Sequence, residues 1–204
     1  MTLNEGEHTI SSENLLDMEA KNKLNVIDEQ GYIIGEETRE IIHKKGLLHR
    51  EAHVWFFTPK GEIIFQHRSK NAETYPDLLD ATVGGHVEIG MEYESTALQE
   101  MEEETGIRTP KDAMLFNQMV RSKTYDTATG MTNNVLRAIY AYRYDGKLEN
   151  LRVEKDEAIG FEAWPLEKIF NIPARERNQF IPATLEKEGQ EIFKKIQQLL
   201  PKHS

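Results

Sequence analysis

The chain has 204 residues, and 38% hydrophobic with 29% charged residues fit a soluble globular protein. Its 35 acidic residues outnumber 25 Lys and Arg, and the net charge of −10 repels duplex nucleic acid and anionic membranes. Having no cysteine excludes disulfides and thiolate chemistry, so a bound metal would need carboxylate, imidazole or backbone oxygen ligands. No apolar run approaches the ~20 residues that span a bilayer, and no secretory signal is present, so we expect a cytoplasmic protein.

The N-terminal part predicts a tail, a hairpin and a helix in that order. Residues 1–20 are polar and predict a flexible tail or a short docking helix. Residues 24–27 and 32–35 predict two strands around a Gly31 turn, and residues 36–45 predict a helix that ends at Gly46. With no repeat or linker-like stretch beyond the tail, we expect residues 21–204 to form a single domain.

The remainder of the chain alternates predicted strands with two longer helices. Strands are expected at 54–57, 63–66, 82–86, 113–120, 134–144 and 161–164. Helices are expected from about Tyr93 to Thr105, ending at Gly106, and over 186–200. This order predicts an α+β fold in which a strand and a glycine turn precede an acidic helix.

The acidic helix carries the clearest chemical signal. Glu100, Glu103 and Glu104 stand at positions i, i+3 and i+4, which places three carboxylates on one helix face. Like charges at this spacing repel each other by a few tenths of a kcal/mol, unless solvent or a cation screens them. A solvated acidic surface is one interpretation of this pattern, and a Mg²⁺ site is the other.

The segment 85–107 resembles the Nudix box, G-x5-E-x7-R-E-U-x-E-E-x-G-U, where U is apolar. Seven of its nine defined positions match, namely Gly85, Glu100, Met101, Glu103, Glu104, Gly106 and Ile107. The resemblance implies a Nudix α/β/α sandwich with a mixed β-sheet, here with an N-terminal β-hairpin extension. It also implies that Glu100, Glu103 and Glu104 bind Mg²⁺ or Mn²⁺.

Two positions depart from the box, because Met91 replaces its first Glu and Gln99 replaces its Arg. In the family these two residues tend to form a supporting ion pair, and losing both leaves no single charge unpaired. The departure predicts a less rigid helix or weaker catalysis, although the metal-binding carboxylates remain.

Segments 46–54, 65–69 and 75–80 resemble the Nudix branch that contains isopentenyl-diphosphate isomerase. Isomerases of this kind carry a cysteine where this chain has Gly84, so hydrolysis is favoured over isomerisation. Histidines at the places of His49 and His86 bind a metal in those isomerases, which raises the alternative of a second metal site. In the other interpretation, His49 and His53 only form hydrogen bonds near the start of their strand.

Further candidates for substrate binding and catalysis flank the box. Gly84 and Gly85 would let the backbone approach phosphates, and His86 adjoins them. Cations for a diphosphate are expected from the following residues: Arg50, Arg68 and Lys70. Glu157 is the candidate acidic ligand or base downstream of the box, with an exposed acidic turn as the alternative.

Together these features predict a metal-dependent hydrolase that cleaves the diphosphate bond of a nucleoside diphosphate linked to another group. Glu103, Glu104 and Glu157 are the predicted catalytic residues, and a small-molecule diphosphate is the predicted partner. One alternative is a hydrolase of isoprenoid or other non-nucleotide diphosphates. Another is a catalytically weakened nucleotide sensor. From the resemblance alone, a homodimer is a further expectation, with the hairpin as its interface.

Overall fold

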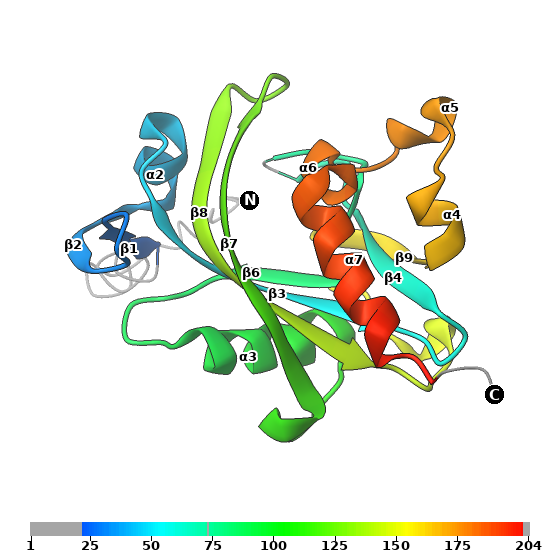
Figure 1. The fold of residues 1–204 in the computed structure, drawn as a ribbon. Helices are drawn as coiled ribbons and strands as arrows, with labels where there is room; N and C mark the ends of the chain where they lie inside the picture. The colour runs from blue at the N-terminus through cyan, green and yellow to red at the C-terminus, as the bar shows by residue number, and fades with distance from the viewer. Residues whose placement is uncertain (1–21, 73, 202–204) are drawn as a thin grey trace, which may run out of the picture.

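The computed structural model describes residues 22–72 and 74–201 (Figure 1). The predicted tail or docking helix of residues 1–20 lies outside these residues. Within the described part of the chain, no helix is long and apolar enough to cross a bilayer.

The predicted hairpin is confirmed, and a short helix follows it directly. Strands β1 (Lys23–Ile27) and β2 (Ile33–Thr38) pair antiparallel as a separate two-stranded sheet, and helix α2 spans Arg39–Lys45. The helix begins later than predicted because residues 36–38 pair with β1, and the Thr38 side chain then caps the helix by accepting from the Ile41 amide. Gly46 ends α2 in the left-handed conformation with φ 62°.

A seven-stranded mixed sheet forms the centre of the molecule, as predicted. Strand β3 pairs in parallel with β8 and antiparallel with β4 and β6, while β7 pairs with β8 at one edge and β9 pairs with β4. The strands are β3 (His49–Phe57), β4 (Glu62–Arg68), β5 (Leu79–Asp80), β6 (Val83–His86), β7 (Met114–Asp126), β8 (Met131–Arg143) and β9 (Ala158–Pro165).

Helices cover both faces of this sheet and make the α/β/α sandwich (Figure 1). Helix α3 (Tyr93–Thr105) buries Ala97 and Met101 against one face, with Val54 and Phe56 of β3. Helix α7 (Lys187–Leu199) packs Phe193 on the other face. Short elements that the sequence did not predict lie between these strands and helices: η1 (Lys111–Ala113), η2 (Leu148–Asn150), α4 (Leu166–Phe170), α5 (Ala174–Arg177) and α6 (Pro182–Leu185).

The pleat of β3 and β6 directs neighbouring residues to opposite faces of the sheet. An added Cβ on Gly84 would meet the His53 ring, whereas an added Cβ on Gly85 would meet the Glu100 carboxylate of α3. Strand β6 therefore separates an acidic cluster on the α3 face from a histidine-containing cavity on the α7 face.

One glycine fixes how α6 and α7 meet. Gly189 is buried, and a Cβ added there would lie 2.0 Å from the Thr184 carbonyl oxygen, which belongs to backbone and cannot rotate away. We expect Gly189→Ala to destabilise the protein by about 1–3 kcal/mol, through overpacking. Thermal denaturation should show a lower Tm for this variant and an unchanged Tm for Gly160→Ala, whose Cβ meets nothing within 4 Å. Equal Tm values for the two variants would contradict this packing.

Candidate active site

Helix α3 spans Tyr93–Thr105, as predicted, and holds its three glutamates in different environments. Glu104 is buried, and its carboxylate accepts hydrogen bonds from the Gly84 amide at 3.1 Å and from the Gln66 side chain. Glu103 is exposed and accepts from Gln99 Nε2 at 3.0 Å. Glu100 is half-buried and packs on Gly85, in space that exists only because this residue has no side chain.

Burial and mutual repulsion oppose ionisation of this acidic cluster. Burial and the neighbouring Glu103 raise the pKa of Glu100 to about 7. Burial and Glu100 raise the pKa of Glu104 well above its ordinary value, against the hydrogen bonds that it accepts. A divalent cation would relieve this repulsion. Among the described residues the ligand atoms of the three glutamates do not all lie within 4.8 Å of one another, so their joint binding of a metal stays a prediction.

Metal-free protein should lose stability as the pH rises, because Glu100 ionises less readily in the folded chain. Its pKa of about 7 lies above the ordinary value of 4.5, so its contribution is complete below pH 4.5 and lost by about pH 7. In chelator, we expect Glu100→Gln to reduce the fall in unfolding free energy between pH 5 and pH 8 by about 1–3 kcal/mol. Urea denaturation at both pH values measures this. An equal fall in both proteins would contradict the assignment.

Met91 and Gln99 replace the Glu and Arg of the box, and other contacts fix the loop that precedes α3. Arg50 donates from Nη2 to the Met91 carbonyl at 3.2 Å, and its guanidinium lies 5.5 Å from the centre of the Tyr93 ring. Gln99 donates the hydrogen bond to Glu103 that is described above. Arg50 therefore fixes the loop that leads into α3, and its predicted contact with substrate stays a prediction.

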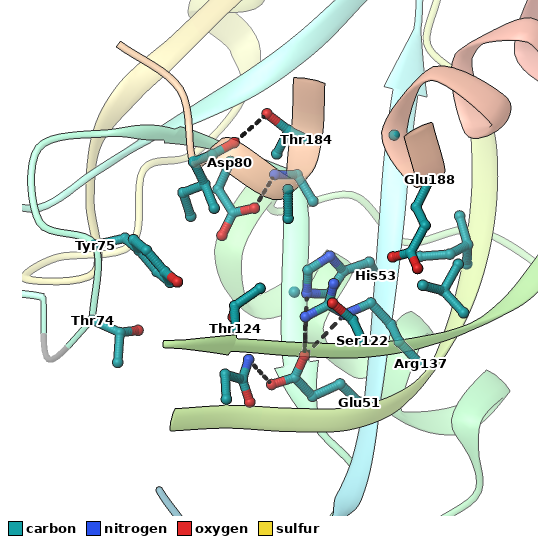
Figure 2. A pocket seen from close by; sticks show the side chains of 18 of the residues that line it. Glu51, His53, Thr74, Tyr75, Asp80, Ser122, Thr124, Arg137, Thr184 and Glu188 are labelled. Atoms are coloured by element: carbon teal, nitrogen blue, oxygen red, sulfur yellow. Dashed lines mark hydrogen bonds and ion pairs between the residues drawn. The ribbon is translucent and has the colours of Figure 1, made fainter. Parts of the chain in front are cut away.

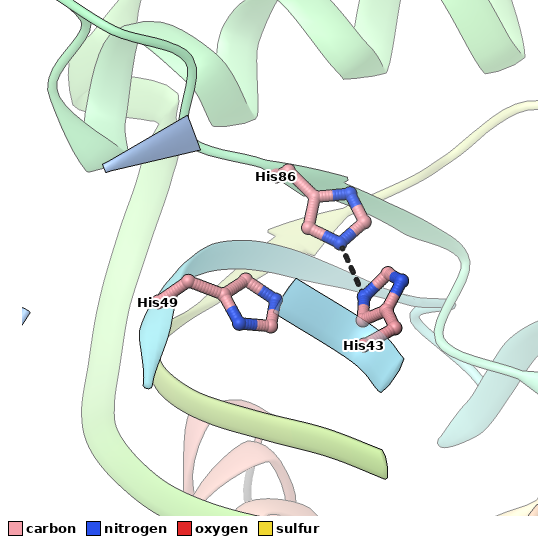
Figure 3. Close-up of side chains that lie close together, drawn as sticks. All are labelled: His43, His49 and His86. Carbon is pink, nitrogen blue, oxygen red and sulfur yellow. Dashed lines mark hydrogen bonds between the residues drawn. The ribbon is translucent and has the colours of Figure 1, made fainter. Parts of the chain in front are cut away.

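Three histidines meet on the other side of β6 (Figure 3). His43 of α2, His49 of β3 and His86 of β6 each offer a ring nitrogen, and these nitrogens lie within 4.8 Å of one another. The His43 and His86 Nε2 atoms are 3.2 Å apart. His49 directs Nδ1 to the Leu47 carbonyl at 3.1 Å, which leaves Nε2 buried without a hydrogen-bond partner. Within the described residues this is the group whose ligand atoms lie close enough for one metal ion.

Glu51 links the histidines to the cavity (Figure 2). Its carboxylate accepts from Arg137 Nε and from Asn133 Nδ2, both at 2.9 Å, and lies 3.6 Å from His86 Nε2 and 3.7 Å from His53 Nε2. Burial disfavours its charge, but Arg137, His49, His86 and His53 together outweigh that effect and hold the pKa of Glu51 well below its usual range. Burial lowers the pKa of His53 to about 4, so this ring is neutral at pH 7.

The cavity has a volume of about 140 Å³ and lies between the sheet and the C-terminal helices. Figure 2 shows Glu51, His53 and Arg137 close together, with Tyr75, Asp80 and Glu188 around them. Its charged residues are Glu51, Arg68, Asp80, Arg137 and Glu188. Two of these five are cations and three are anions. The walls of the cavity therefore suit a polar group, and a diphosphate would meet more negative than positive charges there.

Other predicted site residues fall in different places. Gly84, Gly85 and His86 line the cavity, as does Arg68, which lies 3.6 Å from Asp80. Lys70 is exposed and does not line the cavity. Their roles in binding substrate stay predictions.

In the acidic turn, Glu154 is half-buried and interacts electrostatically with the α3 glutamates. Burial, Glu157 and Glu103 raise the pKa of Glu154, and its charge acts in turn on Glu100 and Glu104. Glu157 is exposed, and its charge acts on Glu154. The catalytic role of Glu157 stays a prediction.

Sequence reasoning missed several residues that the fold brings into the site. Gln66, Glu51 and Arg137 come from strands that are remote in the chain, and no local spacing marks them. His43 was also missed, although its position near the end of the predicted helix 36–45 could have suggested a partner for His49.

Comparison with known proteins identifies the family to which this fold and its acidic helix belong. A family model described as NUDIX domain matches residues 47–184, which is more than half of the chain. The chain therefore belongs to the Nudix family.

Curated relatives are similar over most of this chain but extend beyond it. An uncharacterized Nudix hydrolase of Clostridium acetobutylicum is 27% identical over 143 residues, covering 67% of this chain and 66% of that protein. Nudix hydrolase 3 of Arabidopsis thaliana is 27% identical over 185 residues, covering 88% of this chain and 24% of that protein. The chain thus spans about two thirds of the first relative and a quarter of the second.

Solved structures show the same fold. DR0079 from Deinococcus radiodurans aligns with a TM-score of 0.61 at 18% identity, over 84% of this chain and 97% of that one. The NUDIX domain of Shewanella oneidensis NrtR, solved with ADP ribose, aligns with a TM-score of 0.52 at 14% identity, over 76% and 89%. These likenesses confirm the predicted α+β sandwich.

Proposed function

We propose that the protein is a metal-dependent pyrophosphohydrolase that cleaves the diphosphate bond of a nucleoside diphosphate linked to another group. The observation that carries this proposal is the cluster of Glu100, Glu103 and Glu104 on α3, where burial and then the neighbouring carboxylates raise the pKa values of Glu100 and Glu104. Membership of the Nudix family supports it.

The reaction adds water across the anhydride: a water oxygen bonds to one phosphorus, the bridging P–O bond breaks, and the other phosphate leaves. Glu100, Glu103 and Glu104 would hold Mg²⁺ or Mn²⁺, which supplies charge neutralisation and lowers the pKa of the attacking water. One of these three glutamates, or Glu157, would accept the water proton. Gly84 and Gly85 would let the backbone approach the phosphates of the substrate.

The cavity favours nucleotide-linked substrates over isoprenoid diphosphates, the second candidate class. An isoprenoid tail would have to displace water from the charged groups of Arg68, Asp80, Glu51, Arg137 and Glu188 without replacing its hydrogen bonds. A hydroxylated or heterocyclic group can replace them. The predicted likeness to the isomerase branch remains the reason to keep isoprenoid diphosphates in the test.

A second cation at His43, His49 and His86 is part of this proposal. Burial lowers the pKa of His86 well below its ordinary value, so this imidazole stays neutral and its ring can present a lone pair. Imidazole ligands suit transition metals such as Zn²⁺ and Fe²⁺ better than Mg²⁺. Binding at this site should therefore be tested with Zn²⁺ or Fe²⁺ beside Mg²⁺.

The homodimer also stays a prediction. Tyr32, Ile33 and Ile34, at the turn and start of β2, are 72%, 58% and 66% exposed, so the hairpin offers an apolar surface to a second copy.

The experiment that tests the function is a hydrolysis screen with Mg²⁺ or Mn²⁺, in which the products are separated by chromatography and measured. It should include ADP-ribose, which the Shewanella protein binds, together with other nucleoside diphosphate sugars, dinucleotides, nucleoside di- and triphosphates and geranyl diphosphate. We expect the highest kcat/KM on nucleoside diphosphates linked to another group. Preferential turnover of geranyl diphosphate would replace the proposed substrate class. Ligand-induced thermal stabilisation without turnover would favour the sensor.

A further inference from the structure

The proposed reaction needs a cation for the substrate, yet most arginines near the site already have partners. Arg50 bonds the Met91 carbonyl, Arg68 faces Asp80 and Arg137 bonds Glu51. Arg152 donates to the carbonyl groups of Glu102 and Glu103, at the end of α3. Each of these guanidinium groups would have to exchange a protein contact for a phosphate.

Arg39, the first residue of α2, is different. Its amide bonds the Asn22 carbonyl at 2.9 Å, but across the described residues its guanidinium has no hydrogen bond and no carboxylate within 4.0 Å. The side chain is half-buried. Within the described residues, the positive charge of Arg39 is therefore not balanced by a carboxylate in direct contact with it.

The geometry of α2 turns Arg39 toward the candidate active site. Arg39 and His43 are four residues apart, so they share one face of the helix. On that face His43 meets His86, and His86 follows Gly85, whose open side contacts Glu100. Arg39 therefore lies on the side of α2 that faces the junction of the acidic cluster and the histidines.

The effect of Arg39 on the pKa values of nearby groups agrees with this placement. Burial and Glu103 raise the pKa of Glu100, and the positive charge of Arg39 opposes them. Burial lowers the pKa of His86, and Arg39 lowers it further. Arg39 thus acts on groups of both faces of β6.

The N-terminal unit that carries Arg39 is fixed to the rest of the fold. Leu24 of β1 pairs with Glu88, just after β6, and the Ile27 amide bonds the Leu48 carbonyl at 2.9 Å. At the other end of α2, Asn134 Nδ2 bonds the Gly46 carbonyl at 2.8 Å. These contacts hold α2 at one position, so the guanidinium needs no rearrangement of the backbone to reach the site.

Helix stability gives no reason for a cation at this position. The first turn of a helix carries the positive end of its dipole, where an acidic or neutral residue is favoured over Arg. Thr38 already caps the helix. Removing the charge should therefore leave α2 as stable as before or slightly more stable.

We propose that Arg39 binds the diphosphate of the substrate beside the α3 glutamates, so that the N-terminal hairpin and α2 form part of the active site. This inference rests on the proposed function, since it assigns a residue to the same substrate. A guanidinium suits the task because its fork of N–H donors matches two phosphate oxygens at once.

The test compares Arg39→Gln and Arg39→Lys with Lys44→Gln, which removes an exposed charge elsewhere on α2. Two quantities are measured: KM for the best substrate of the screen, and Kd for inorganic pyrophosphate with Mg²⁺ by calorimetry. We expect Arg39→Gln to raise both by about 10- to 100-fold, with an unchanged or higher Tm. Arg39→Lys should lie between it and the wild type, and Lys44→Gln should match the wild type.

The pyrophosphate titration keeps this inference separate from the proposed function. A wild-type protein that hydrolyses nothing would overturn the function, whereas the titration would still test Arg39. An unchanged Kd in Arg39→Gln, or an equal rise in Lys44→Gln, would overturn the inference. A lower Tm in Arg39→Gln that accounts for its weaker binding would also overturn it, by showing a structural role.

Discussion

Replacing Glu104 or Glu103 by Gln is expected to lower kcat by about a hundredfold or more, because each change removes a charged metal ligand or proton acceptor. Glu104→Gln keeps the size of the buried side chain that Gly84 and Gln66 contact, so we expect this variant to fold. Steady-state kinetics at saturating Mg²⁺, on the best substrate of the screen, measures the effect.

A matched control lies on the same helix. Glu102 pairs with the exposed Arg108 at 2.5 Å and does not face the cluster, so Glu102→Gln should keep wild-type kcat. If Glu102→Gln and Glu104→Gln lost activity equally, the loss would come from total charge rather than from a metal site. If Glu104→Gln kept full activity, its assignment as a metal ligand would be wrong.

Gly85→Ala should weaken metal binding without removing any carboxylate. The added Cβ would lie 2.1 Å from Glu100 Oε1 and 2.6 Å from its Cγ, so the whole side chain must turn away. We expect the Mg²⁺ concentration for half-maximal activity to rise by about 10- to 100-fold, the scale seen when metal ligands lose their orientation. A Mg²⁺ titration of activity measures this shift.

Gly84→Ala is the contrasting variant, because its Cβ would lie 2.8 Å from His53 Nε2, on the cavity side of β6. It should raise KM for the substrate and leave the Mg²⁺ requirement unchanged. The same Mg²⁺ shift in both variants would contradict the separation of the two faces by β6.

Local patterns predicted most of the elements that build this fold. The limits of α3 were predicted correctly because Gly106 adopts φ 74° and ends the helix, which the sequence signals through glycine alone. The start of α2 was predicted too early, since residues 36–38 have a helical pattern but pair with β1. Pairing with a neighbouring strand overrides the local helical preference here, and the local sequence pattern does not reveal which strand will pair.

The carboxylates of the candidate site were predictable, but the groups around them were not. Glu100, Glu103 and Glu104 lie within one helix turn and a half, so their spacing places them on one stretch of α3. Gln66 reaches Glu104 across 38 positions of sequence, and Arg137 reaches Glu51 across 86. The cations predicted from their place near the box, such as Arg50, turned out to have structural partners, while Arg39 gave no local signal.

Cleavage of a diphosphate bond by the α3 glutamates with a divalent cation is the central proposal. The most direct test is formation of the two phosphate monoesters from ADP-ribose and the other nucleotide-linked members of the screen by the wild-type protein, with Mg²⁺, with chelator, and with Mg²⁺ restored in excess. The account predicts turnover with Mg²⁺, its loss in chelator and its recovery afterwards. Turnover that persists in chelator, or no turnover of any diphosphate with either Mg²⁺ or Mn²⁺, would contradict it.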